Sequence, residues 1–163
     1  MRTLVKCFVV LVVFSLPIFG QIVDGSKTEP KFDPQSNVQQ NLDNAVKMAK
    51  ESGKRIILDV GGEWCIWCHR IDDFINSHAD IHDFLYNNYV VVKVNYSPEN
   101  KNEEFLSKYP KIEGYPHIFV LDTDGKLLKS KNTGELEHEK SYSAEKMMAF
   151  FREFAAKGQG KSY

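Results

Sequence analysis

Two cysteines three residues apart, Cys65 and Cys68, constrain this chain more than any other feature. They follow the apolar run 56–60, which predicts a buried strand leading into a helix that carries both thiols on its first turn. A helix N-terminus stabilises negative charge, so it favours the thiolate, the form of cysteine that attacks disulfides. The spacing also lets the two sulfurs join, which predicts a site that can hold or release an electron pair.

The first twenty residues differ in kind from the rest of the chain. Arg2 and Lys6 precede an apolar stretch, and Gly20 offers a small residue for cleavage. We expect residues 1–20 to be a cleaved secretory signal peptide, because the apolar stretch is shorter than the roughly 20 residues that a membrane-spanning helix needs. An uncleaved membrane anchor is the alternative. The sequence therefore predicts an exported protein, in a periplasm or another extracytoplasmic space.

Cysteine count and charge narrow the possible functions. Of the three cysteines, Cys7 would leave with the signal peptide. A bridge between the other two closes almost no loop and would add little stability, so we expect a chemical rather than a structural role for it. Loss of residues 1–20 changes the formal net charge from -1 to -3, with 19 Lys and Arg against 22 Asp and Glu. This mildly acidic balance gives no support for nucleic-acid binding.

The pattern of apolar residues predicts one α/β domain. We expect it over residues 37–157, after a polar, proline-containing linker at 21–36 and before a C-terminal tail at 158–163. Helical periodicity predicts helices at about 37–52, 65–77, 80–87, 100–109 and 143–157. Apolar runs predict strands at 55–60, 89–94 and 118–121, with a turn and a return strand at 126–130. Residues 131–142 are expected to form a charged loop, in which the charge run 135–140 is solvated. This order favours a mixed central sheet with helices on both faces.

Three separated motifs give residues 37–157 a resemblance to the thioredoxin superfamily. The first is Asp59-Val60-Gly61-Gly62-Glu63-Trp64-Cys65-Ile66-Trp67-Cys68, where an acid and a tryptophan precede the cysteines at the family's spacing. The second is Lys93-Val94-Asn95 on the second strand, and the third is Gly114-Tyr115-Pro116. The Trp-Cys-x-Trp-Cys-His form resembles the extracytoplasmic thioredoxin-like subgroup.

The resemblance implies a thioredoxin fold and an enzyme, a thiol–disulfide oxidoreductase. Cys65 would be the nucleophile and Cys68 the resolving thiol, while Asp59 would be a buried proton acceptor for Cys68 and Lys93 would pair with Asp59. For Asp59 a strand-end acid turned to solvent is the alternative, and for Lys93 a surface charge. The residues between the cysteines, Ile66 and Trp67, differ from the Gly-Pro of thioredoxins, and this dipeptide tunes the redox potential. We expect the protein to act as a reductase.

The resemblance also assigns residues to substrate contact. It implies a cis bond before Pro116, whose ring would pack beside the sulfurs while the backbone of Tyr115 hydrogen-bonds an extended substrate. Trp64 and Trp67 would form an apolar rim around Cys65. Core packing is the alternative for both tryptophans, and the sequence favours it more for Trp64 than for Trp67.

The expected partners follow from this reaction. They are protein disulfide substrates and a redox protein that resets the cysteine pair. No bound cofactor or metal is expected, since the cysteines themselves are the redox centre, and we expect a monomer. A non-catalytic binding module of the same fold is the alternative from another functional class.

His69 leaves two further alternatives open. Residues 65–69 match the Cys-x-x-Cys-His pattern of haem attachment. A haem would need a second axial ligand, for which the candidates are Met48, Met147 and Met148. The two cysteines and His69 would bind a metal only with another ligand. The other histidines show no paired spacing: His78, His82, His117 and His138.

Overall fold

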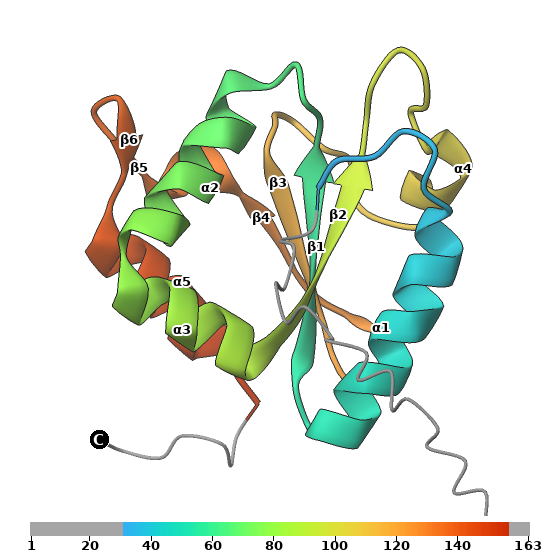
Figure 1. Cartoon of the computed structure of the whole chain (residues 1–163), viewed down its shortest axis with the longest axis horizontal. Helices are drawn as coiled ribbons and strands as arrows, with labels where there is room; N and C mark the ends of the chain where they lie inside the picture. The colour runs from blue at the N-terminus through green and yellow to red at the C-terminus, as the bar shows by residue number, and fades with distance from the viewer. Residues whose placement is uncertain (1–30, 157–163) are drawn as a thin grey trace, which may run out of the picture.

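The computed structural model describes residues 31–156 (Figure 1). The expected signal peptide, residues 21–30 of the expected linker and the C-terminal tail lie outside the described residues. Four strands form one sheet in the order β2-β1-β3-β4. Their bounds are β1 (Arg55–Gly61), β2 (Tyr89–Asn95), β3 (His117–Leu121) and β4 (Leu127–Asn132). The β1–β2 pair is parallel and the other two pairs are antiparallel, which confirms the expected mixed sheet.

Helices cover both faces of this sheet, as expected (Figure 1). One face carries α1 (Val38–Ser52), and the other carries α2 (Ile66–Ser77), α3 (Ala79–Asn88) and α5 (Ala144–Phe154). Alternate side chains of β1 point to opposite layers, because a strand has a period of two. Ile56 and Leu58 pack with α1, whereas Ile57 packs with the other three helices. Asp59 shares the face of Ile57 and therefore points toward α2.

The helices begin and end where local chemistry favours it. The side chain of Asn37 caps α1 by accepting a hydrogen bond from the Gln40 N–H, and Gly53 ends the helix in the left-handed conformation with φ 68°. Cys65 itself is the N-cap residue of α2. At the expected break, His78 adopts an extended conformation between α2 and α3.

The helix expected at 100–109 is much shorter than predicted. Only α4 (Glu103–Leu106) forms. It starts after Asn102, which is left-handed with φ 48°, and it ends before Pro110, which disfavours a helical conformation in the preceding residue. Phe105 is buried there, so the apolar pattern marked buried side chains without extending the helix.

The expectation of a loop over the whole of 131–142 is wrong, although Glu135, Glu139 and Lys140 of its charge run are exposed. After β4, the chain forms a 3₁₀ turn, η1 (Thr133–Leu136), and a small hairpin of β5 (Glu137–His138) and β6 (Ser141–Tyr142). Leu136 and Tyr142 are buried in the core between the sheet and α2, α3 and α5. Two apolar anchors thus hold a segment whose other residues are mostly charged. Among the residues that the structure describes, no helix has both the length and the apolar character needed to cross a membrane.

Candidate redox site

The two cysteines lie at the N-terminus of α2 and are joined by a disulfide, with Cα atoms 5.2 Å apart. The Cys65 sulfur accepts a hydrogen bond from the Cys68 N–H at 3.1 Å. Cys65 is 4% exposed, whereas Cys68 is fully buried. In the reduced protein the same N–H and the helix dipole would stabilise a thiolate on Cys65, because both present positive charge to it. The predicted passage from a buried strand to a thiol-bearing helix is confirmed.

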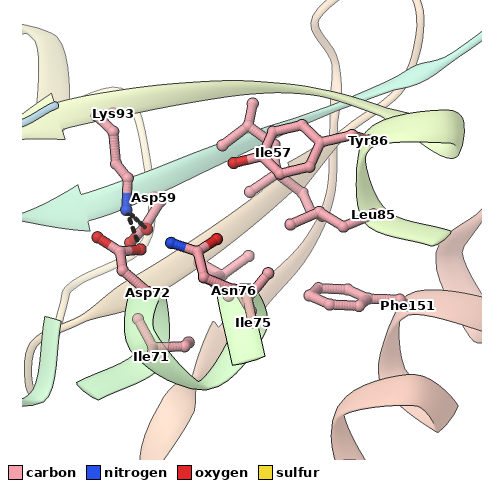
Figure 2. A pocket seen from close by; sticks show the side chains of 12 residues that line it. Ile57, Asp59, Ile71, Asp72, Ile75, Asn76, Leu85, Tyr86, Lys93 and Phe151 are labelled. Atoms are coloured by element: carbon pink, nitrogen blue, oxygen red, sulfur yellow. Dashed lines mark hydrogen bonds and ion pairs between the residues drawn. The ribbon is translucent and has the colours of Figure 1, made fainter. Parts of the chain in front are cut away.

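A buried ion network lies beneath the helix (Figure 2). Lys93 Nζ donates to Asp59 Oδ2 at 2.6 Å and to Asp72 Oδ1 at 2.5 Å. Asp59 and Lys93 face each other in the register of β1 and β2, and both are buried. Burial alone would lower the pKa of Lys93, but the two carboxylates outweigh it and hold that pKa above its ordinary value. The expected pairing is confirmed, and the surface alternatives for both residues are wrong.

Asp72 is a member of this network that the motifs did not indicate. It lies one helical turn beyond Cys68 on α2, and its side chain is 36% exposed. The available signal was its spacing, since residues four apart share a helix face. An acid four residues after the second cysteine therefore falls on the face that covers β1 and β2.

Only one carboxylate oxygen of Asp59 accepts a hydrogen bond from Lys93. Its Oδ1 is buried and has no hydrogen-bond partner among the described residues. Asp59 also lines a cavity of about 30 Å³, together with Asp72, Asn76, Tyr86 and Lys93 (Figure 2). That volume has room for one water molecule beside polar groups. Asp59 therefore sits where a carboxylate can exchange a proton with a water.

Aromatic side chains form a wall beside the cysteines. The Trp64 indole N–H donates to the Tyr96 carbonyl at 2.6 Å, and its ring meets the edge of Tyr115 at 5.7 Å. Tyr115 stacks on Tyr96 at 4.8 Å and packs against the cluster of Phe32, Cys65 and Cys68. Burial, with Tyr96 next to it, raises the pKa of Tyr115 to about 12. Trp64 is 54% exposed, so it belongs to the rim and core packing is wrong for it. The motifs did not indicate Tyr96.

Trp67 is partly core and partly rim. It packs against the cysteine cluster and against the core beneath α2, where its ring meets the edge of Tyr142 at 5.8 Å. The Arg70 guanidinium lies 4.4 Å from its ring centroid. The sequence favoured core packing more for Trp64 than for Trp67, and the structure reverses that order. Ile66, between the cysteines, is 60% exposed and extends the apolar surface next to Cys65.

The loop before β3 approaches the same place. The Tyr115–Pro116 bond is cis, as expected. In the register of β1 and β3, Val60 pairs with His117, so Pro116 comes level with Gly61. A Cβ on Gly61 would overlap the Cys68 sulfur, which shows how closely β1 approaches the buried cysteine. The register therefore places Pro116 at the cysteine end of the sheet.

His69 makes a local contact rather than completing a ligand set. A hydrogen bond of 2.8 Å joins its Nε2 to the Glu63 carbonyl, across the turn that carries Cys65. The candidate haem ligands are split: Met48 is exposed on α1, whereas Met147 is buried on α5, across the sheet. Within residues 31–156, no three His, Cys, Asp or Glu side chains gather as a metal site requires. The described residues therefore support neither a haem site nor a metal site at the cysteine pair.

Known proteins are similar to this chain at the level of family and fold. Residues 42–155 match the model of the thioredoxin-like domain. The disulfide bond reductase DsbH of Chlamydia pneumoniae is 30% identical over 103 residues, which cover 57% of this chain and 61% of that protein. The thiol:disulfide interchange protein DsbD of Colwellia psychrerythraea is 30% identical over 95 residues, 57% of this chain and 16% of that protein.

A solved structure agrees with the fold. The disulphide isomerase from Xylella fastidiosa has a TM-score of 0.66 at 23% identity, covering 77% of this chain and 97% of that one. The chain spans 61% of the length of DsbH and 16% of DsbD, so these two relatives contain regions that it does not match. The domain match over 42–155, the shared fold and the paired cysteines place the chain in the thioredoxin-like family.

Proposed function

We propose that this protein is a thiol–disulfide oxidoreductase that reduces disulfides of extracytoplasmic proteins. The observation that carries the proposal is the asymmetry of the cysteine pair. Cys65 lies at the N-terminus of α2 beside an exposed apolar rim, and Cys68 is buried behind it. The name of the DsbH relative, a disulfide bond reductase, supports the direction.

The proposed reaction has two exchange steps. The Cys65 thiolate attacks one sulfur of a substrate disulfide; that bond breaks, and the other substrate sulfur leaves as a thiolate that takes up a proton. Cys68 then loses its proton and attacks the Cys65 sulfur. The mixed disulfide breaks, the second substrate thiolate leaves, and the Cys65–Cys68 disulfide forms. Two electrons pass from the protein to its substrate, and the cysteines serve as the redox centre without a bound cofactor or metal.

Asp59 is the proposed acceptor of the Cys68 proton, through a water molecule. The unpartnered Oδ1 supports this role, since the other oxygen accepts from Lys93. The adjoining cavity can supply a water molecule to Asp59. Lys93 is proposed to keep Asp59 ionised, because an ammonium ion at 2.6 Å favours the charged carboxylate. Asp72 shares that ammonium ion and would stabilise it when Asp59 becomes neutral.

The substrate is proposed to be an extended polypeptide that lies across the aromatic rim. Trp64 and Ile66 offer exposed apolar surface on either side of Cys65, and Trp67 adds a partly buried edge. The backbone of Tyr115, before the cis bond to Pro116, is the proposed hydrogen-bonding edge for the peptide. Pro116 is proposed to keep the approach to the sulfurs narrow enough to disfavour metal capture.

Export and resetting complete the proposal. We propose that residues 1–20 direct export and are removed, that the domain works as a monomer, and that a second thiol–disulfide protein returns electrons to the cysteine pair. The apolar N-terminal stretch and the DsbD relatives, named thiol:disulfide interchange proteins, support this setting.

Insulin reduction tests the proposal. Cys65→Ser should abolish the activity, because the remaining thiol, Cys68, is fully buried and cannot reach a substrate disulfide. Cys68→Ser should instead accumulate mixed disulfides between Cys65 and the substrate, visible on non-reducing gels. Activity retained in Cys65→Ser would refute the assignment, and a parent protein without activity would favour a binding module.

A further inference from the structure

A phenylalanine from outside the expected domain covers the buried half of the redox site. Phe32 lies in the segment that the sequence predicts as a linker, yet its side chain is only 4% exposed. It clusters with Cys65 and Cys68. The Lys93 ammonium lies 4.5 Å from its ring centroid. Two ring atoms lie 3.1 and 3.3 Å from the place where a Cβ on Gly61 would be. The ring thus covers the buried thiol and the buried ammonium ion together.

The chain around Phe32, residues 31–36, is held in place and is called the strap below. Asn100 Nδ2 donates to the Pro34 carbonyl at 2.9 Å, from the loop after β2. Asn41 Nδ2 donates to Ser36 Oγ at 2.5 Å, from the first turns of α1. In Figure 1 this blue segment passes the ends of β1 and β2 and runs beside α4 to the start of α1. Two separate parts of the domain therefore fix the position of Phe32.

The neighbours of the ring distinguish it from an ordinary core residue. Phe32 belongs to neither of the two large apolar clusters on the faces of the sheet. Its contacts are instead the sulfur that must lose a proton and the ammonium ion paired with Asp59. An aromatic face stabilises a cation while it keeps water away, and charges interact more strongly where water is excluded.

We propose that Phe32 is a positioning residue that seals Cys68 and Lys93 from solvent. With the seal closed, the Cys68 proton passes only to Asp59, and the Cys68 sulfur meets only the Cys65 sulfur. With the ring removed, water and small electrophiles reach Cys68 directly. The effect of this seal on catalysis rests on the proposed disulfide exchange. The access of solvent to Cys68 can be measured without a substrate.

The test is alkylation of Cys68 by iodoacetamide. In the full chain carrying Cys7→Ser and Cys65→Ser, Cys68 is the only thiol. Phe32→Ala should raise the alkylation rate of Cys68 by at least about tenfold. In the parent the reagent reaches Cys68 only when the structure opens locally, and removal of the ring makes that opening easier. Phe32→Leu keeps an apolar cover and should raise the rate by less than about threefold. An unchanged rate in Phe32→Ala overturns the inference.

A matched control separates sealing from general loosening. Phe105→Ala removes a ring of equal size and similar burial, 5% exposed, from the core beneath α1. It should leave the Cys68 alkylation rate within about twofold of the parent. An equal rise in Phe105→Ala and Phe32→Ala would mean that both act through stability, and would overturn the inference. If Phe32→Ala does not fold, Phe32→Leu and Phe32→Val give a series in which the covering side chain becomes smaller. An alkylation rate of Cys68 that does not rise along this series would also overturn the inference.

The pH profile of turnover gives the second readout. With both cysteines restored, resolution of the mixed disulfide in Phe32→Ala should become steeper with pH than in the parent, because solvent can then deprotonate Cys68. Parallel profiles would limit Phe32 to a packing role and overturn the inference. The proposed function fails separately, if the parent chain reduces no disulfide while the alkylation results stand.

Discussion

Lys93→Met should destabilise the oxidised protein more than Asp59→Asn, although the two residues form one ion pair. Lys93 has two carboxylate partners, at 2.6 Å in Asp59 and 2.5 Å in Asp72. Asp59 accepts from Lys93 through one oxygen, and its other oxygen has no hydrogen-bond partner among the described residues. Loss of Lys93 therefore leaves a buried carboxylate without its cation, whereas loss of Asp59 leaves the ammonium ion paired with Asp72.

The magnitudes follow from this asymmetry. Removing one partner of a buried ion pair costs about 3–5 kcal/mol of unfolding free energy, and we expect Lys93→Met in that range. Asp59→Asn keeps the shape and leaves one imperfectly paired amide, which costs about 1–2 kcal/mol. Asp72→Asn should cost less than about 1 kcal/mol, since that side chain is 36% exposed and solvent screens its charge.

Urea unfolding of the oxidised proteins at pH 7, followed by far-UV circular dichroism, measures these differences with the disulfide held constant. The double variant Lys93→Met/Asp59→Asn should be more stable than Lys93→Met alone, because no unpaired buried charge remains. If Asp59→Asn costs as much as Lys93→Met, then Asp72 does not hold the ammonium ion, and the three-residue network is refuted.

Two further predictions concern other buried positions. Gly61→Ala should lower the unfolding free energy by about 1–3 kcal/mol, since the new methyl would overlap the Cys68 sulfur. Gly114→Ala, with nothing within 4 Å of its Cβ position, should change the unfolding free energy by less than about 0.5 kcal/mol. Equal effects of the two substitutions would contradict the close approach of Gly61 to Cys68. Burial lowers the pKa of His117, so the unfolded chain binds that proton more readily; stability should therefore fall as pH drops below about 6.5, by at most about 1.4 kcal/mol per pH unit for one proton. Urea titrations from pH 7.5 to pH 5 should show a flatter dependence in His117→Asn, and an unchanged slope would exclude His117 as the cause.

Much of the site could be predicted because its residues lie on elements with strong local patterns. The runs 56–60 and 90–92 are continuous enough to predict buried strands, and parallel pairing of those strands brings Asp59 and Lys93 together. The Cys-x-x-Cys spacing after the first run predicted the thiols at a helix N-terminus, where they lie.

The parts that could not be predicted depend on contacts between distant segments. Phe32 is a lone aromatic residue in a polar segment, without periodic neighbours to mark it as buried. The spacing of Asp72 places it on the helix face that covers the sheet, but its ion pair with Lys93 depends on how α2 packs on β1 and β2. Leu136 and Tyr142 are separated by mostly charged residues, so the pattern did not reveal that both are buried. Trp64 is exposed, and its indole N–H bonds to the Tyr96 carbonyl, a contact that no spacing rule predicts.

Equilibration of the full chain carrying Cys7→Ser with glutathione buffers tests the central claim most directly, with the redox state of Cys65 and Cys68 read by trapping of free thiols. The account predicts one two-electron transition in which both thiols change together, at a potential closer to the about -270 mV of thioredoxin than to the about -120 mV of the oxidant DsbA. A midpoint near the oxidant's value would reverse the proposed direction of electron flow. Two thiols that never titrate as a pair would contradict the redox centre itself.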